Sequence, residues 1–309
     1  MKNLRKIILA GVAAIVTSTS FSLADGLKIV ASFSILGDMA RQIGGDNVSV
    51  TTLVGPDSDA HVYEPKPADA VAFAQAQVVL VNGLGFEGFM ERLAKTSAST
   101  ATLVEVSKGA ALIEAGDAHG DGAAAASDEH GHGGIDPHAF QSVPNARIYV
   151  KNIVEALCTA DEADCETFKA NAAAYDVQLV ALDSDIRTAV AAIPADKRAV
   201  ITSHDAFGYL AHEYGLTFHA PEGISTDSEA SAADVARLID QIREEKASAL
   251  FVENISDPRL VNQISAETGI KVGGALYSDA LSAADGPAST YIDLMRNNIA
   301  TIKGAILGS

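Results

Sequence analysis

The sequence predicts an α/β protein of two Rossmann-like lobes, each built on a central, mostly parallel sheet, joined by one long rigid helix. Two observations predict this fold. From residue 27, short runs of β-branched residues alternate with stretches of helical periodicity. The same alternation restarts at residue 199, beyond a long helical stretch. An alternation of strands with helices is typical of a parallel sheet that is covered by helices.

The expected elements follow from these runs. In the first half we expect helices at residues 35–44 and 68–76, and strands at residues 27–30, 48–54, 77–81 and 102–106. In the second half we expect strands at residues 199–202, 249–252 and 270–272. Each half therefore has enough strands to form a sheet of its own.

The stretch between the two halves predicts one continuous helix at residues 166–193, which Pro194 ends because proline cannot continue a helix. At 1.5 Å per residue, such a helix is ~40 Å long. We interpret it as a strut that allows limited hinge motion. It would join an N-terminal α/β lobe, residues 25–165, to a C-terminal α/β lobe, residues 194–309.

Residues 1–24 have the pattern of a secretory signal peptide. Lys2, Arg5 and Lys6 form a positive segment, an apolar run covers residues 7–16, and small residues precede a cleavage point after Ala24. The apolar run is shorter than the ~20 residues that a membrane span needs. No cysteine stands at the cleavage point to carry a lipid anchor. We therefore expect an exported, soluble protein of the periplasm.

Net charge narrows the possible partners. Loss of the three positive charges of the signal peptide takes the formal net charge from −18 to −21. A chain this acidic repels phosphate backbones and anionic lipid surfaces, so we expect no nucleic-acid partner. We expect a monomer.

The sequence has two cysteines, Cys158 and Cys165. In an oxidising compartment a pair this close usually forms a disulfide bond. A C-x6-C metal pair is the alternative, but no histidine or second cysteine pair lies nearby in the sequence. We expect a structural disulfide that is dispensable for the chemistry.

Residues 114–134 consist largely of alanine, glycine, aspartate and histidine, with almost no apolar bulk. Such a segment buries too little surface to become ordered, so we expect a mobile loop. The loop carries His119, His130 and His132. These side chains are candidates for metal recruitment or for recognition of a metal-donating partner, and the alternative is a solvated linker.

Four side chains that bind metals in proteins follow expected strands. They are His61, His138, His204 and Asp279, separated by 77, 66 and 75 residues. Ligands bind at the carboxyl ends of the strands in open α/β sheets. The spacings are far too long for a zinc finger, so only a fold that gathers distant strand ends could make one site from them. Taken alone, each histidine is more often a surface or core residue than a ligand.

Six blocks of sequence resemble the cluster A-I solute-binding proteins of zinc and manganese ABC importers, a family that includes the zinc-binding AztC proteins. The blocks are residues 32–38, 59–65, 136–138, 202–209, 252–254 and 276–279. The resemblance runs through nearly all of the chain after the signal peptide. It implies a metal at the interface of two lobes, with His61, His138, His204 and Asp279 as its ligands. One departure is Phe140, at a position where the family often has tryptophan.

The resemblance also implies the function. We expect a periplasmic protein, not an enzyme, that captures Zn²⁺ and delivers it to an ABC transporter permease and its ATPase, with a metallochaperone as a further possible partner. Manganese-type members of the family have glutamate where this chain has His204, and three imidazoles favour zinc. The alternatives are a manganese or other transition-metal binding protein of the same type, and a periplasmic zinc hydrolase.

Ligating imidazoles usually donate their second N–H to a carboxylate or a carbonyl. The acids close to the four candidate ligands in the sequence or in its motifs are equal candidates for this role. They are Asp59, Glu64, Asp136, Asp205 and Glu253.

Gly83, Gly85 and Gly88 form a G-x-G-x-x-G pattern after an expected strand, as in a dinucleotide-binding turn. Glu87 argues against this reading, because its charge would repel a pyrophosphate at the start of the following helix. We therefore expect a tight turn with close helix packing.

The loop hypothesis has a direct test. Deletion of residues 118–133 removes all three loop histidines and should leave one tight metal site while slowing metal loading or transport. Metal titration of the purified protein and metal uptake by cells at scarce zinc measure the two effects. Unaltered uptake would favour the solvated linker.

Overall fold

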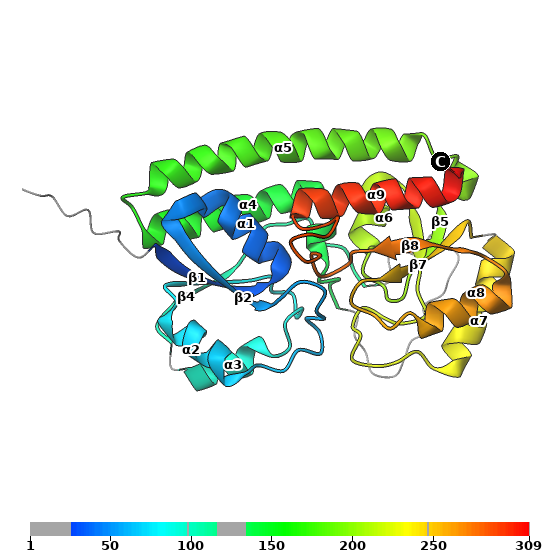
Figure 1. Ribbon diagram of the computed structural model, residues 1–309, viewed down its shortest axis with the longest axis horizontal. Helices are drawn as coiled ribbons and strands as arrows, with labels where there is room; N and C mark the ends of the chain where they lie inside the picture. Colours follow the sequence, from blue (N-terminus) through cyan, green and yellow to red (C-terminus); the bar gives the residue numbers. More distant parts are fainter. Residues whose placement is uncertain (1–25, 98, 116–133, 246, 309) are drawn as a thin grey trace, which may run out of the picture.

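Each half of the chain folds around a four-stranded parallel sheet (Figure 1). The computed structural model describes residues 26–97, 99–115, 134–245 and 247–308. The first sheet has the order β2-β1-β3-β4 and contains β1 (Leu27–Phe33), β2 (Val48–Val54), β3 (Val78–Val81) and β4 (Thr102–Glu105). The second has the order β6-β5-β7-β8 and contains β5 (Ala199–Ile201), β6 (Thr217–His219), β7 (Ala249–Glu253) and β8 (Val272–Leu276). The predicted fold class is confirmed.

Helices cover the sheets and join them. The N-terminal lobe contains α1 (Ser34–Gly44), α2 (Pro67–Gln75), α3 (Met90–Ser97), the short 3-10 helix η2 (Ala139–Gln141) and α4 (Val143–Ala160). The C-terminal lobe contains α6 (Gly208–Tyr214), α7 (Ala232–Glu245) and α8 (Arg259–Thr268). Two further helices, α5 (Cys165–Ala191) and α9 (Tyr291–Leu307), lie along one side of the molecule.

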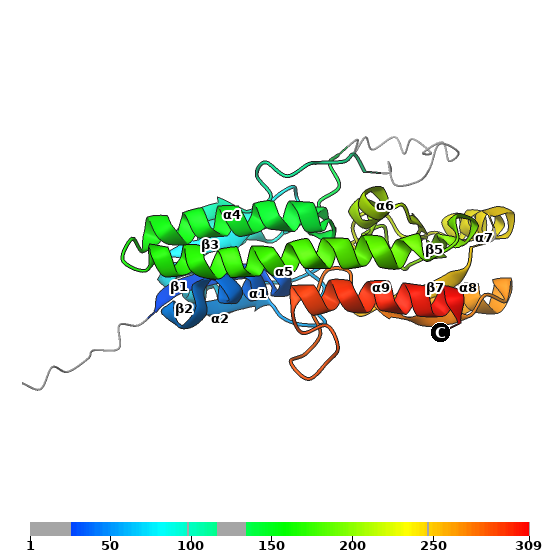
Figure 2. The ribbon, with the colours of Figure 1, turned by 90° about the horizontal axis from the view of Figure 1, so that it is seen from above.

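Helix α5 is the predicted long strut, and it extends over both lobes (Figure 1). It has 27 residues, which corresponds to ~40 Å at 1.5 Å per residue. Its buried side chains recur every three or four residues and so form one stripe; they are Phe168, Ala172, Tyr175, Leu179, Leu182, Ile186 and Val190. The stripe packs between α4 and α9, which lie on either side of α5 (Figure 2).

The C-terminal helix α9 is a second connection between the lobes that the sequence patterns did not predict. The hydroxyl of Thr290 caps its first turn by accepting a hydrogen bond from the N–H of Asp293. At the same end, the carboxylate of Asp38 in α1 accepts a hydrogen bond from the N–H of Tyr291 at 2.8 Å. The first turn of α9 is therefore fixed to the N-terminal lobe.

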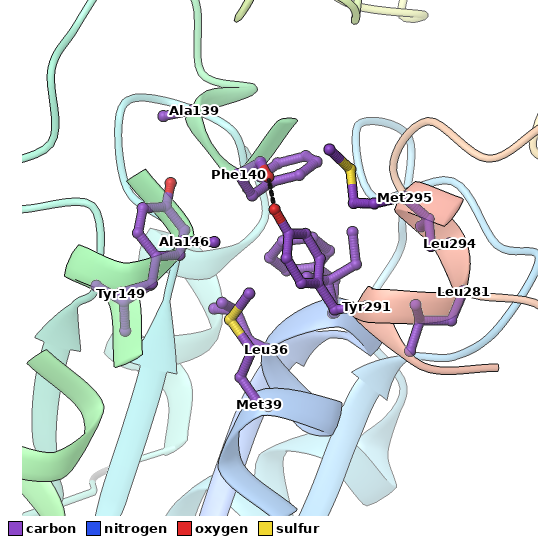
Figure 3. Close-up of a cluster of buried hydrophobic side chains, with 14 of the residues drawn as sticks. Leu36, Met39, Ala139, Phe140, Ala146, Tyr149, Leu281, Tyr291, Leu294 and Met295 are labelled. Atoms are coloured by element: carbon purple, nitrogen blue, oxygen red, sulfur yellow. Dashed lines mark hydrogen bonds between the residues drawn. The ribbon is translucent and has the colours of Figure 1, made fainter. Parts of the chain in front are cut away.

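One hydrophobic core runs through both lobes. Near the junction, Tyr291 and Met295 of α9 pack beside Leu36 and Met39 of α1 and against Phe140 (Figure 3). The buried hydroxyl of Tyr291 donates a hydrogen bond to the carbonyl oxygen of Phe140 at 2.8 Å. A smaller second cluster lies under α7 and α8 at the far side of the C-terminal lobe. The shared core means that the two lobes are not independent of each other.

The last strand, β8, lies further along the chain than predicted. Residues 270–272 were expected to form it, whereas the strand is Val272–Leu276. Gly269 ends α8 in the left-handed conformation, and the strand then includes two glycines, which are poor strand formers. A Cβ at Gly273 would lie 2.5 Å from Ala305 of α9 and 2.8 Å from the ring of Phe251. Close packing of α9 over β8 therefore requires a residue that the strand pattern disfavours.

The expected cysteine pair lies where two helices of the N-terminal half meet. The sulfur atoms of Cys158 and Cys165 are 2.05 Å apart, at the distance of a disulfide bond, where α4 turns into α5. The predicted signal peptide and the loop residues His119, His130 and His132 lie outside the described residues. None of the helices that the structure describes combines the length and the apolar character needed to cross a membrane.

Packing of α5 is testable by shortening one side chain. Leu182 is fully buried, so Leu182→Ala should lower the free energy of unfolding by about 2–5 kcal/mol through loss of burial and a residual cavity. Val177 on the same helix is 69% exposed, and Val177→Ala is the control, with an expected change within about 0.5 kcal/mol. Urea denaturation measures both, and equal losses would contradict the assigned face of the helix.

Candidate metal centre

Four side chains from distant parts of the sequence meet where the two lobes face each other. His61 follows β2, His204 follows β5 and Asp279 follows β8, as expected, whereas the expected strand before His138 is wrong: this residue lies after an isolated bridge at Ile135 and precedes η2. Each offers one donor atom, and these atoms all lie within 4.8 Å of one another. Among the residues that the structure describes, this is the one group of three or more histidine, cysteine or acidic side chains that converges in this way.

The carboxylate of Asp279 lies at the centre of the group. Its Oδ2 is 3.2 Å from Nε2 of His61 and 3.2 Å from Nε2 of His204, and its Oδ1 is 3.5 Å from Nε2 of His138. The side chains of His138, His204 and Asp279 are fully buried, and that of His61 is 4% exposed. The result is a buried set of three imidazole nitrogens and one carboxylate.

Several of these atoms lack the hydrogen bonds that buried polar atoms normally make. Nε2 of His61, Nε2 of His138 and Oδ1 of Asp279 are buried without a well-aligned hydrogen-bond partner. The large majority of buried side-chain polar atoms in proteins do have one. A cation held by all four side chains would satisfy them together, and imidazole with carboxylate is a donor set that divalent transition metals accept.

Two carboxylates hold the opposite sides of two imidazole rings. Oδ1 of Asp136 lies 2.8 Å from Nδ1 of His138, and Oε2 of Glu253 lies 2.6 Å from Nδ1 of His204. A carboxylate at Nδ1 places the proton there and leaves Nε2 free for the centre of the site. Of the five acids that the sequence left as equal candidates, Asp136 and Glu253 have this position.

The neighbouring acids have other contacts. Asp59 accepts a hydrogen bond from the backbone N–H of His61 at 2.8 Å, and so fixes the loop rather than the ring. Glu64 pairs with Arg92 at 3.5 Å on the exposed surface. Asp205 is buried, and its backbone N–H donates to the carbonyl oxygen of Gly223 at 3.1 Å.

Aromatic rings form one wall of the site. The ring of Phe86 lies 5.0 Å from that of His61 and 5.8 Å from that of His138, and Phe140 lies 6.0 Å from His138. Phe140 therefore occupies the wall position where the family often has tryptophan. The sequence did not predict Phe86 or Gln141 as residues of the site. The side-chain amide of Gln141 donates a hydrogen bond to the carbonyl oxygen of Ser278 at 2.6 Å. Neither Phe86 nor Gln141 stands in a local pattern that indicates a metal site.

A cavity of about 560 Å³ leads to the site from the surface. His61 lies on its wall together with apolar residues from both lobes, among them Phe86, Pro137 and Ile224. Ala115 and Gly134, which border the histidine-containing segment, line the same cavity. An ion that enters by this cavity reaches His61.

Burial and the neighbouring charges shift the pKa values of His138, His204 and Asp279 in opposite directions. Burial opposes the charged form of His138, but the carboxylates of Asp279 and Asp136 raise the pKa of His138 to about 9. In the same way, Glu253 and Asp279 overcome the effect of burial and hold the pKa of His204 well above its ordinary value. Burial favours a neutral Asp279, yet His138 and His204 hold the pKa of Asp279 well below its ordinary value. Without a metal, the positive charge of the protonated imidazoles balances the negative charge of the buried carboxylates.

The glycine-rich turn is filled by its own chain. The carboxylate of Glu87 accepts hydrogen bonds from the N–H groups of Asn82 at 2.6 Å and Gly83 at 3.2 Å, and from the hydroxyl of Ser32 at 2.6 Å. Glu105 accepts the N–H of Leu84 at 3.3 Å. Backbone donors of the kind that bind a pyrophosphate are therefore already occupied by carboxylates. The turn is structural, as expected.

Known proteins are similar to this chain over nearly its whole length. A family model described as zinc-uptake complex component A, periplasmic, matches residues 29–305. The iron-binding protein YfeA of Yersinia pestis is 34% identical over 294 residues, which cover 95% of this chain and 91% of the relative. The manganese-binding lipoprotein MntA of Halalkalibacterium halodurans is 34% identical, over 96% of this chain and 93% of the relative.

Solved structures agree with the sequence relatives. The periplasmic zinc-binding protein TroA of Treponema pallidum superimposes with a TM-score of 0.81 at 29% identity, over 90% of this chain and 98% of that structure. A manganese-bound mutant of a periplasmic metal-binding protein of Candidatus Liberibacter asiaticus gives 0.79 at 31% identity, with the same coverage. The relatives thus differ in the metal that their names state.

The raised pKa of His138 predicts that the affinity for Zn²⁺ and the stability of the metal-free fold change in opposite directions with pH. Metal binding must displace the proton, so affinity for Zn²⁺ should rise from about pH 6 to about pH 9, with at least one proton released per ion. The raised pKa also stabilises the metal-free fold at low pH, and this contribution should be lost as the pH rises through about 9. Calorimetry in buffers of different ionisation enthalpy measures the protons, and thermal melting measures the stability. A zinc affinity that does not change with pH would contradict the assignment.

Proposed function

This chain belongs to the family of periplasmic zinc-uptake complex component A, and from that membership we propose that it captures Zn²⁺ and delivers it to an ABC importer. Proteins of this family are metal-binding components, not enzymes, and they work with a permease and its ATPase. The family accounts for the fold and for the class of cargo. The choice of metal rests on the residues of this chain.

The observation that carries the proposal is the buried group of three imidazoles and one carboxylate. Manganese is a harder ion and prefers oxygen ligands, whereas zinc accepts imidazole readily in a four-coordinate site. His204 is the third imidazole, and Glu253 supports it from behind at 2.6 Å. Glu253 holds the imidazole of His204 in place as a nitrogen ligand. An oxygen ligand at the same position would instead favour manganese or iron.

Relatives whose names state iron, manganese and zinc make other divalent metals the second candidate. They share the fold with this chain at 29–34% identity, so the fold alone does not select the metal. A zinc hydrolase is a weaker alternative. Catalytic zinc needs an open coordination position, and four converging protein ligands leave none in a tetrahedral site.

Capture and delivery follow from the same geometry. The ion enters by the cavity beside His61 and replaces the protons on the imidazoles, while Asp136 and Glu253 keep the rings aligned. Delivery requires the permease to separate ligands that come from different parts of the chain. A metal-donating chaperone, a monomeric state and a recruiting role for His119, His130 and His132 remain predictions.

Replacement of His204 tests the proposed metal. His204→Ala should weaken Zn²⁺ binding by more than the roughly 10–100-fold that loss of a supporting partner costs. His204→Glu should shift the preference from Zn²⁺ towards Mn²⁺, because it exchanges nitrogen for oxygen. The exposed His212 provides the control, and His212→Ala should bind as the unmodified protein does.

Competition titration with each metal gives the affinities. Unchanged zinc affinity in His204→Ala would remove this residue from the ligand set. A preference for Mn²⁺ in the unmodified chain would overturn the proposal of zinc and leave the transport function standing.

A further inference from the structure

The loop that carries Asp279 belongs to the C-terminal lobe by sequence and has hydrogen bonds to Asn298 and Asn254 of that lobe, but others connect it to the N-terminal lobe. The carbonyl oxygen of Ser278 accepts a hydrogen bond from Gln141 at 2.6 Å. The N–H of Leu281 donates to the hydroxyl oxygen of Ser34 at 2.9 Å. Both contacts are buried, and they lie on either side of Asp279.

Asp57, four residues before His61, makes further contacts with this loop. Its own N–H donates to the carbonyl oxygen of Leu281 at 2.9 Å, and its Oδ2 accepts the N–H of Ala283 at 3.3 Å. Its Oδ1 accepts a hydrogen bond at 3.0 Å from Asn254, whose amide also donates to the carbonyl oxygen of Ala280 at 3.2 Å. One residue of the N-terminal lobe thus holds the Asp279 loop at several points.

The backbone of Asp57 is adapted to this task. Its φ of 50° lies in the left-handed region, which aspartate tolerates better than most residues do. In this conformation the backbone N–H and the side chain both contact the Asp279 loop.

His204 is held in a different way. Oε1 of Glu253 accepts the N–H groups of Ser203 at 2.7 Å and His204 at 2.9 Å, and Oε2 lies 2.6 Å from Nδ1 of His204. Glu253 is the last residue of β7, so these contacts stay within the C-terminal lobe. The four candidate ligands therefore divide into three that are connected to the N-terminal lobe and one that is not.

We propose that Asp57 is a positioning residue for the metal site. It fixes the Asp279 loop to the N-terminal lobe, so that His61, His138 and Asp279 form one group, whereas His204 is fixed by Glu253 of the C-terminal lobe. His204 closes the site from the other side. This inference rests on the proposed function, because metal binding is its readout, and it assigns the order in which the ligands separate: His204 leaves first.

The test uses Asp57→Gly in the full-length mature protein. Glycine adopts the left-handed conformation without strain, so the variant removes the carboxylate and keeps the turn and its N–H. Zn²⁺ affinity is measured by chelator competition for Asp57→Gly alone and in combination with His204→Ala or Asp279→Ala. Glu64→Ala removes the same charge from the same loop without a contact between the lobes, and it is the control.

Asp57→Gly should weaken Zn²⁺ binding about tenfold, and by a similar factor in the His204→Ala background, as loss of a supporting contact does. In the Asp279→Ala background the effect should shrink to less than about twofold, because residues that act through one another are not additive. The Co²⁺ absorption spectrum should also change in Asp57→Gly, which a loss of stability alone would not cause.

Three results would overturn the proposal. They are an unchanged affinity in Asp57→Gly, an equal loss in the Asp279→Ala background, and no measurable binding in His204→Ala. Repeating the titrations with Mn²⁺ separates this inference from the proposed function. If the unmodified chain prefers Mn²⁺, the choice of zinc fails while the same comparisons still test Asp57.

Discussion

The buried carboxylate of Asp279 is the group on which the site depends. It contacts the Nε2 atoms of three histidines that come from distant parts of the sequence, and it has no exposed surface. A buried charge of this kind is stable only when opposite charge surrounds it. Protonated imidazoles provide this charge in the metal-free protein, and a divalent cation would provide it in the loaded one. The rest of the fold serves to keep these side chains at this distance.

Much of the fold could be predicted from periodicity. The β-branched run of β2 and the apolar stripe of α5 are local signals, and the structure has both elements within two residues of the expected bounds. Helix α9 and strand β8 could not be predicted in the same way. Gly273 and Gly274 weaken the strand signal; Gly273 is required because Ala305 of α9 and the ring of Phe251 lie close to it, and Gly274 has a φ of 140°, which favours glycine. That requirement becomes visible only when both elements are placed.

The candidate site likewise includes residues that the sequence predicted and residues that it did not. His61, His138, His204 and Asp279 could be named because six sequence blocks resemble a family, whereas their spacing alone left them unconnected. Asp136 and Glu253 could not be distinguished from the three other nearby acids by sequence, since each contact depends on where an imidazole ring points in the fold. The wall residue Phe86 had no local signal, because it reaches His61 only through the turn that Glu87 stabilises.

The identical strand order of the two sheets has a consequence for the donor set. The first half contributes two imidazoles, and the second half contributes one imidazole and one carboxylate. A symmetric molecule made from two copies of the first half would offer four neutral ligands, and one made from two copies of the second half would offer two negative charges. The single negative charge of this centre therefore arises only from pairing two unlike halves of the same architecture.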